Sequence, residues 1–218
     1  MPSRPIRLRP AHGDRYCPDG GEPGGEGGTL VGVGTTAGVV LAADTRTSRD
    51  TTVTSEASRK LESVHPTAAI GSSADLGRSR SFVHALRADV DRYENRHGRL
   101  MPLSALATVA GREHRSHSLD ATVVLGGVDE TGSNVFTVDG DEGVLEVDYT
   151  AEGSGRELAF GVLDRGYAET LSLKETQALV SRAIDSAVER DARTGSALAF
   201  AMVTEDGVDV RRPESTDG

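Results

Sequence analysis

TLVGV at residues 29–33 and GVVLAADTR at residues 38–46 form the stretch of this chain that decides the fold. Each segment begins with a short apolar run rich in valine, and such runs are typical of strands. Residues 35–38, Thr-Thr-Ala-Gly, lie between the two runs and are expected to form a turn. The sequence therefore predicts two short strands joined by a tight turn.

Apolar residues recur three and four positions apart further along the chain. Phe82, Leu86, Val90 and Tyr93 form one apolar stripe, which predicts a helix from about residue 74 to 96. Pro102 is expected to start a second helix, because proline suits the first helical turn. This second helix is expected over residues 103–117. The other expected elements are strands at 51–54, 67–70, 121–128, 133–138, 143–148, 197–203 and 207–211, and helices at 156–167 and 172–190.

The order of these elements indicates the fold class. Strands are followed by two helices, then strands, two more helices and a last pair of strands. Strands and helices that are segregated in this way favour an α+β fold over a βαβ fold with a parallel sheet. We therefore expect two antiparallel sheets sandwiched between two layers of helices.

Composition divides the chain into three parts. Residues 1–27 are rich in proline, glycine and charged residues and cannot form a core, so they are expected to be a flexible leader resembling a propeptide. Residues 28–211 carry the strand and helix patterns and form the expected domain. Residues 212–218 are expected to be an acidic, frayed tail.

Charge and cysteine content exclude several function classes. The formal net charge is −10, and an acidic surface repels nucleic acid. Cys17 is the only cysteine, so no internal disulfide and no cysteine cluster for a metal can form, and we expect no cofactor. No apolar run approaches the roughly 20 residues of a membrane helix, and the leader lacks the apolar region of a secretory signal. The sequence therefore predicts a cytoplasmic protein.

Lysine is scarce in this chain, because only two of its 24 Lys and Arg residues, Lys60 and Lys174, are lysines. Excess acid with little lysine suits a cytoplasm of high ionic strength, where salt screens the repulsion between surface acids. We expect a high-salt archaeal source. A GC-rich genome is the alternative explanation of the scarce lysine, but it accounts less readily for the acidity.

The opening strands and four later motifs resemble the β-type subunits of the proteasome. The resemblance covers roughly residues 28–205, and five motifs in the right order are a much stronger signal than any one of them. The later motifs are Arg59-Lys60-Leu61, Gly71-Ser-Ser-Ala-Asp75, Gly153-Ser-Gly155 with Phe160-Gly-Val-Leu163, and Arg190-Asp191 with Thr194-Gly195.

The resemblance implies a fold, an activity and partners. The family fold is the four-layer αββα sandwich of N-terminal-nucleophile hydrolases, which agrees with the element order. The implied assembly is a ring of α-type and β-type subunits that degrades unfolded polypeptide. Residues 1–27 lack the helical extension of α-type subunits, which favours the β type.

In this family the nucleophile is the hydroxyl of a threonine that self-cleavage after a glycine places at the start of the chain. A hydroxyl needs a base, and the free α-amine, with an ordinary pKa of about 8, can accept its proton at neutral pH. The resemblance matches Lys60 to the lysine beside that hydroxyl and Asp44 to the lysine's partner. Gly71 matches the residue whose N–H faces the oxyanion.

Three further residues match the family's polar positions around the terminal amine. Ser154, Asp191 and Thr194 correspond to the residues that bond the amine and position the attacking water. Asp191 also has a plain structural interpretation, as a residue at the end of a helix.

The nucleophile position is where this chain departs from the family. Spacing from Asp44 and Lys60 places the nucleophile at residue 28, which is glycine and has no hydroxyl. Thr29 follows it directly and is preceded by a glycine, as a cleavage site requires. Because successive strand residues point to opposite faces, Thr29 is expected to turn away from Lys60 unless a bulge at the chain end restores the geometry.

Three interpretations stay open on the sequence alone. The first is a non-catalytic or weakly active β-type subunit, in which Asp44 and Lys60 form a structural ion pair. The second is an active threonine endopeptidase that uses Thr29 after removal of the leader. The third is a stand-alone scaffold or binding protein on the same fold.

Overall fold

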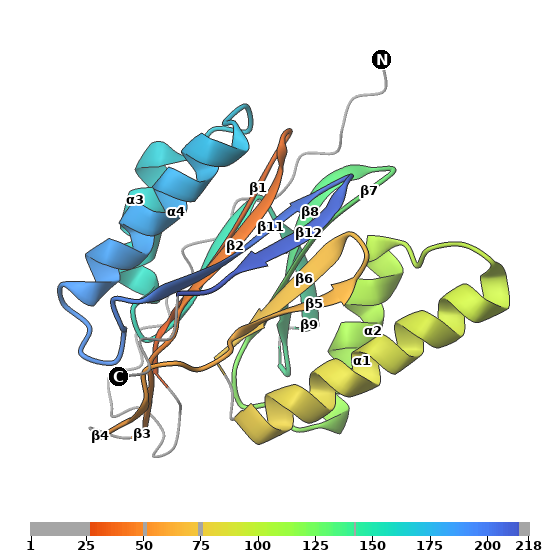
Figure 1. Cartoon of the computed structure of the whole chain (residues 1–218), viewed down its shortest axis with the longest axis horizontal. Helices are drawn as coiled ribbons and strands as arrows, with labels where there is room; N and C mark the ends of the chain where they lie inside the picture. The colour runs from red at the N-terminus through yellow and green to blue at the C-terminus, as the bar shows by residue number, and fades with distance from the viewer. Residues whose placement is uncertain (1–26, 50–51, 74–75, 142, 214–218) are drawn as a thin grey trace.

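The computed structural model describes residues 27–49, 52–73, 76–141 and 143–213. The predicted leader up to residue 26 and the last five residues of the predicted tail lie outside the described residues. The described chain folds into four layers, with two sheets between two pairs of helices (Figure 1).

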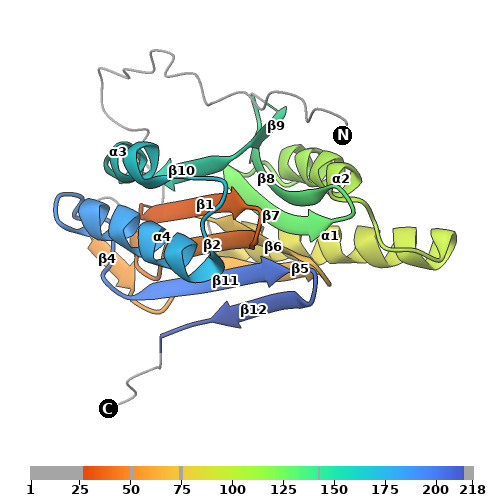
Figure 2. The same cartoon turned by 90° about the horizontal axis from the view of Figure 1, so that it is seen from above.

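One five-stranded antiparallel sheet contains the opening hairpin. Its strand order is β10-β1-β2-β11-β12, and Figure 2 shows these strands side by side with β10 and β12 at the two edges. Because β1 is paired on both sides, it lies inside this sheet rather than at its edge. The bounds are β1 Thr29–Thr35, β2 Gly38–Asp44, β10 Tyr149–Gly153, β11 Leu198–Thr204 and β12 Gly207–Arg211.

The second five-stranded sheet has the order β5-β6-β7-β8-β9 and is also antiparallel. A separate two-stranded hairpin, β3-β4, projects from the end of the molecule at which β2 ends (Figure 1). The bounds are β3 Thr47–Arg49, β4 Thr52–Ser55, β5 Leu61–His65, β6 Ala68–Ser72, β7 Val123–Asp129, β8 Gly132–Asp139 and β9 Gly143–Val147.

Helices cover the outer face of each sheet. The bounds are α1 Leu76–His97, α2 Leu103–Ser116, α3 Arg156–Gly166 and α4 Leu173–Val188. The first pair, α1 and α2, packs on the second sheet, and α3 and α4 pack on the sheet that holds β1 and β2 (Figure 1). A third apolar cluster, which includes Leu30, Leu41 and Val124, fills the space between the two sheets. The predicted α+β fold with four layers is confirmed.

Local signals in the sequence account for most of the boundaries. The α1 stripe is buried at Phe82, Leu86 and Val90. The capping box at the start of α4 is present, because Ser172 Oγ accepts from the Glu175 N–H and the Glu175 carboxylate accepts from the Ser172 N–H. All four predicted helices are found, with ends that differ by at most two residues from those expected.

Three strands were not predicted, namely β3, β5 and β10. The β5 segment, Leu-Glu-Ser-Val-His, is mixed in polarity and carries no clear strand pattern. The predicted strand at 143–148 corresponds to β9, and β10 begins two residues after β9 ends. Between them the chain leaves the second sheet and enters the first, and the sequence pattern did not show this change. Sheet pairing, rather than local sequence, stabilises these short strands.

One end of the first sheet collects the elements that carry the predicted site. Thr29 at the start of β1 pairs with Gly153 at the end of β10, and Asp44 at the end of β2 pairs with Leu198 in β11. The chain after Gly153 and the loop before Leu198 therefore meet at this end, which places residues distant in sequence side by side.

Candidate active site

Asp44 is the centre of the site, and both of its carboxylate oxygens are fully used. Oδ1 accepts from the Thr29 N–H at 2.7 Å and from Lys60 Nζ at 2.9 Å. Oδ2 accepts from the N–H groups of Arg46 at 3.0 Å and Gly195 at 2.9 Å. The buried carboxylate thus joins β1, the chain after β2, the residue before β5 and the loop before β11.

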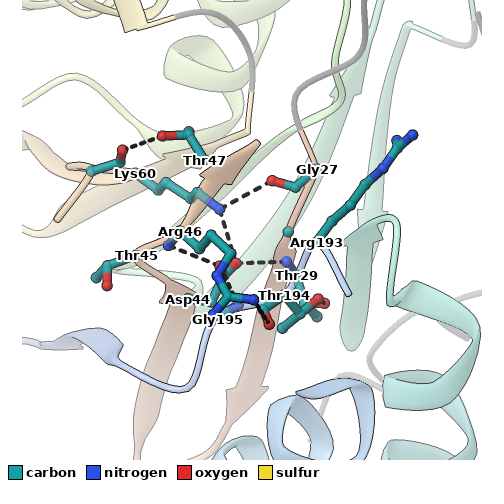
Figure 3. Close-up of polar contacts among 12 residues, drawn as sticks. Gly27, Thr29, Asp44, Thr45, Arg46, Thr47, Lys60, Arg193, Thr194 and Gly195 are labelled. Carbon is teal, nitrogen blue, oxygen red and sulfur yellow. Dashed lines mark hydrogen bonds and ion pairs between the residues drawn. The ribbon is translucent and has the colours of Figure 1, made fainter. Parts of the chain in front are cut away.

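Lys60 and Asp44 form a buried ion pair. Their side chains are 2% and 0% exposed, respectively. The ammonium has one further acceptor among the described residues, the carbonyl oxygen of Gly27 at 3.4 Å, and Figure 3 shows Lys60 reaching between Gly27 and Asp44. The resemblance predicted that Lys60 and Asp44 are partners, and in the structure the two side chains are in direct contact.

Gly28 lies against this ion pair. A Cβ atom built on Gly28 would stand 2.2 Å from Lys60 Nζ and 2.5 Å from Asp44 Oδ1. The side-chain direction of residue 28 therefore points at the ion pair, as a nucleophile at this position would require. In this chain the two charged groups lie so close to the Gly28 backbone that a side chain at residue 28 would have to displace them.

A second polar cluster lies on the other side of the β1 strand. Asp191 Oδ2 accepts from Ser154 Oγ and from Thr194 Oγ1, each at 2.6 Å. Ser154 Oγ also accepts from the Gly28 N–H at 3.1 Å. The three residues matched to the amine-binding positions are therefore in contact with each other and with the backbone of residue 28.

Thr29 belongs to this second cluster and not to the ion pair. Its Oγ1 lies 2.7 Å from Thr194 Oγ1. Because the Thr194 hydroxyl donates to Asp191, its oxygen is left to accept, and Thr29 is the donor. The Thr29 side chain therefore points away from Lys60, as strand alternation predicts, and it is 1% exposed.

Gly71 lies near Lys60 only through the main chain. It sits in β6 opposite Leu61, the residue after Lys60, and the neighbouring Ser72 N–H donates to the Lys60 carbonyl at 3.0 Å. A Cβ on Gly71 would meet Leu30 at 2.5 Å, so its side-chain direction faces the space between the sheets. Among the described residues no hydrogen bond joins Gly71 to Gly28, and its oxyanion role stays a prediction.

Two site residues were not singled out from the sequence. Arg46 donates from Nη1 to the carbonyls of Ala192 at 3.0 Å and Thr194 at 3.3 Å, which holds the loop that carries Asp191. Arg193 lies alongside Gly27 (Figure 3), with its Cβ and Cδ each 2.4 Å from where a Gly27 Cβ would stand. Arg46 is the last residue of the GVVLAADTR motif, so the motif could have identified it as a site residue. Nothing in the sequence indicates the direction of the Arg193 side chain.

Metal and membrane sites were also sought in the described part of the chain. No cluster of three or more His, Cys, Asp or Glu side chains suited to a metal occurs there. The helices in the same ranges include none with the length and apolar character needed to cross a membrane.

The two polar clusters flank residue 28, the position at which the resemblance predicts a nucleophile. An ammonium paired with a carboxylate lies on one side of residue 28, and a serine, a threonine and a second carboxylate lie on the other. A hydroxyl attached at residue 28 would stand between the two groups. Residue 28 is glycine and carries no hydroxyl.

Comparisons with known proteins agree with this architecture. The sequence profile described as "Proteasome subunit" matches residues 25–203. "Proteasome subunit beta 2" of Haloterrigena turkmenica is 45% identical over 187 residues, which cover 85% of this chain and 79% of that protein. "Proteasome subunit beta" of Haloferax volcanii is 41% identical over 193 residues, covering 88% of this chain and 79% of the relative.

A third relative extends the match over more of the chain. "Proteasome subunit beta" of Halomicrobium mukohataei is 41% identical over 207 residues, which cover 94% of this chain and 87% of that protein. The profile match includes both polar clusters described above, the four helices and the strands as far as residue 203 in β11. On this evidence the chain belongs to the proteasome subunit family.

Proposed function

We propose that this chain is a non-catalytic β-type subunit of a ring-shaped, cytoplasmic assembly that degrades unfolded polypeptide. The names of the relatives, "Proteasome subunit beta" in two cases and "Proteasome subunit beta 2" in the third, support the β type. Its partners in the ring are proteasome α-type subunits and other β-type subunits, of which some must carry the nucleophile.

One observation carries the non-catalytic part of the proposal. Gly28 has its side-chain direction aimed at Lys60 Nζ and Asp44 Oδ1, at 2.2 Å and 2.5 Å from a Cβ. The chain therefore lacks a hydroxyl at the one place where both clusters could act on it. Catalytic groups of this kind act as a unit, so losing the nucleophile removes most of the rate that the others support.

A second candidate function, peptide hydrolysis by Thr29, has one observation in its favour. The Thr29 hydroxyl donates to Thr194, which donates to the Asp191 carboxylate, and such a chain can carry a proton away from a nucleophile. Against it, Thr29 is 1% exposed and its hydroxyl faces away from Lys60. Substrate would reach Thr29 only after the preceding residues had been removed.

Peptide hydrolysis and the N-terminal mass decide between these functions. The purified chain in high-salt buffer, alone and assembled with α-type and β-type partners, should not cleave a fluorogenic peptide or react covalently with a threonine-protease inhibitor. Hydrolysis that is lost in Thr29→Ala, together with a mature chain that begins at Thr29, would establish the second candidate instead.

Assembly is tested separately by size-exclusion chromatography with α-type and β-type proteasome subunits. We expect this chain to elute with a ring complex. If it stays monomeric with every candidate partner, the chain is a stand-alone scaffold or binding protein on the same fold.

A further inference from the structure

A cavity of about 580 Å³ lies at the end of the sheets away from the Asp44 site. Its lining comes from the β5–β6 turn, the chain between α1 and α2, the β7–β8 turn and the residue that follows β11. In β11, Leu198 pairs with Asp44, and Glu205 of the cavity comes seven residues after Leu198. Seven residues of strand span about 23 Å, so the cavity is separate from the candidate active site.

The floor of this cavity is apolar. Four of its lining residues are Leu100, Met101, Pro102 and Val128. Leu100 is 50% exposed, the largest exposed fraction of any large apolar residue in the described ranges. The cavity volume falls within the range of about 300–1,000 Å³ that is usual for ligand pockets. An exposed leucine beside an apolar cavity indicates a surface that another segment of polypeptide can cover.

Carboxylates surround the apolar floor. Asp129, Glu130 and Glu205 line the cavity. Glu130 and Glu205 are exposed and form no ion pair with the basic side chains that the structure describes. The arginine in the lining, Arg99, lies over the ring of Tyr93, 5.7 Å from its centroid. The cavity therefore fits a segment that combines apolar and basic side chains.

One segment of this chain has that chemistry. Residues 4–10 have the sequence Arg-Pro-Ile-Arg-Leu-Arg-Pro and lie outside the described residues. They contain three arginines and no acidic residue, in a chain whose formal net charge is −10. Proline directly after the first and the last of these arginines favours an extended backbone there. An extended backbone places Ile6 and Leu8 on one face and Arg7 and Arg9 on the other.

The chain between this segment and β1 is long enough to reach the cavity. Pro10 and Gly27, the first described residue, are 17 positions apart. A fully extended chain of that length spans about 56 Å at 3.3 Å per residue. The cavity lies only about 23 Å along the sheet from the end at which β1 begins. The length of the leader therefore allows the segment to reach its own domain.

We propose that residues 4–10 bind in this cavity of their own chain. Ile6 and Leu8 lie against the apolar floor, and the long arginine side chains reach Glu130 and Glu205 at the rim. Both kinds of contact are needed in a high-salt cytoplasm, because at 1 M salt the Debye length is about 3 Å and only direct ion pairs keep their attraction. The bound segment covers the cavity as long as the leader is attached, and removal of the leader uncovers an apolar surface.

A nitroxide on the leader of the full-length chain tests the proposal. Ser3→Cys combined with Cys17→Ser leaves a single thiol for the label, directly before the arginine-rich segment. Paramagnetic broadening falls steeply with distance, so the methyl signals of Leu100, Met101 and Val128 should lose intensity in the NMR spectrum. The same sample after chemical reduction of the nitroxide provides the reference spectrum.

Two pairs of substitutions remove the two kinds of contact. Ile6→Ser with Leu8→Ser removes the apolar side chains of the segment, and Glu130→Gln with Glu205→Gln removes the rim charges. Each pair should restore most of the lost methyl intensity. All four side chains lie in the leader or on the surface, so the fold of the domain should be retained.

The matched control removes two exposed carboxylates elsewhere. Glu157 lies in α3 and Glu189 directly follows α4, and Glu157→Gln with Glu189→Gln should leave the broadening unchanged. The proposal is wrong if the cavity methyl groups keep their intensity beside the active nitroxide. It is also wrong if the two glutamine pairs have equal effects.

A mixing experiment distinguishes the chain's own leader from that of a second copy. Methyl-labelled chain without a nitroxide is mixed with unlabelled chain that carries one, and the cavity signals should keep their intensity. Broadening in this mixture would show that the segment binds a neighbouring copy, which overturns the proposal. These readouts do not depend on catalysis, so peptide hydrolysis by the chain would overturn the proposed function without affecting this inference.

Discussion

Lys60 and Asp44 lie 2.9 Å apart, between Nζ and Oδ1, in an ion pair that is almost completely buried. The same Asp44 carboxylate accepts three backbone N–H groups, from Thr29, Arg46 and Gly195. The Asp44 carboxylate therefore holds together four segments of the chain, and this structural role does not depend on whether the site is catalytic.

Lys60→Met should strongly destabilise the chain. Breaking a buried ion pair by removing one partner typically costs about 3–5 kcal/mol, because the remaining charge is left unpaired. The free energy of unfolding from urea denaturation measures this loss. Lys174→Met is the matched control, since Lys174 is the only other lysine and is exposed, and it should change the stability by less than about 0.5 kcal/mol. Equal effects of the two substitutions would contradict a structural role for the pair.

Thr29→Val should lower stability and leave peptide hydrolysis at its background level. The substitution removes the buried hydroxyl that donates to Thr194, at a cost of about 1–3 kcal/mol for the acceptor left without a partner. Thr29→Ser keeps the hydroxyl and should retain most of that stability. Thermal unfolding and the fluorogenic assay check both expectations, and a chain whose hydrolysis disappears with Thr29→Val would show that Thr29 is a nucleophile.

Gly28→Thr should make the uncut chain less stable and promote cleavage after Gly27. At a φ of +134° a threonine is strained by about 1–3 kcal/mol, and its Cβ would displace Lys60. Cleavage of the bond between residues 27 and 28 abolishes that φ torsion and releases the strain. Among single substitutions we expect this one to restore peptidase activity, in the fraction of chains that are cut.

The control for this variant is Gly28→Ala, which has the same strain but no hydroxyl. Intact-mass spectrometry should detect leader removal in Gly28→Thr and none in Gly28→Ala. If neither variant is cut and neither loses stability, residue 28 does not occupy the position that the structure gives it.

Stability should fall as the pH drops below about 6.5 because of His65. Burial lowers the pKa of His65 from its ordinary value of 6.5, although Glu94 and Asp129 partly oppose the shift. The unfolded chain then binds a proton at a higher pH than the folded chain, so the stability present above pH 6.5 is lost as the pH falls toward the lower folded value.

The geometry around His65 is consistent with a neutral ring. The Thr67 N–H donates to Nδ1 at 3.2 Å, which places the ring proton on Nε2, 3.5 Å from Glu94 Oε1. His65→Gln should flatten the loss of thermal stability between about pH 7 and pH 5, where an unperturbed histidine titrates. His84→Gln, at an exposed histidine, is the control substitution. A steeper slope in His65→Gln would contradict the direction of the shift.

Local pattern was enough to predict the helices, most of the strands and the four-layer fold. The α1 stripe and the Ser172–Glu175 capping box act within a few residues, so they are readable one segment at a time. The strand β5 was missed because its residues are mixed in polarity and it is stabilised by pairing with β6. The strand β10 was missed because it is stabilised by pairing with β1, which is distant in sequence. The resemblance supplied Asp44, Lys60, Ser154, Asp191 and Thr194 as one set, and the structure places their side chains in two clusters around Gly28.

The sequence by itself determined that residue 28 has no hydroxyl, and strand alternation was sufficient to turn Thr29 away from Lys60. Only the tertiary structure decided what fills the place of the missing side chain. Arg193, Gly153 and Lys60 come from three different segments, and their approach to Gly27 and Gly28 depends on how the sheets and loops pack. A local sequence pattern does not predict such contacts, because they depend on how closely segments from different parts of the chain pack together in the folded domain.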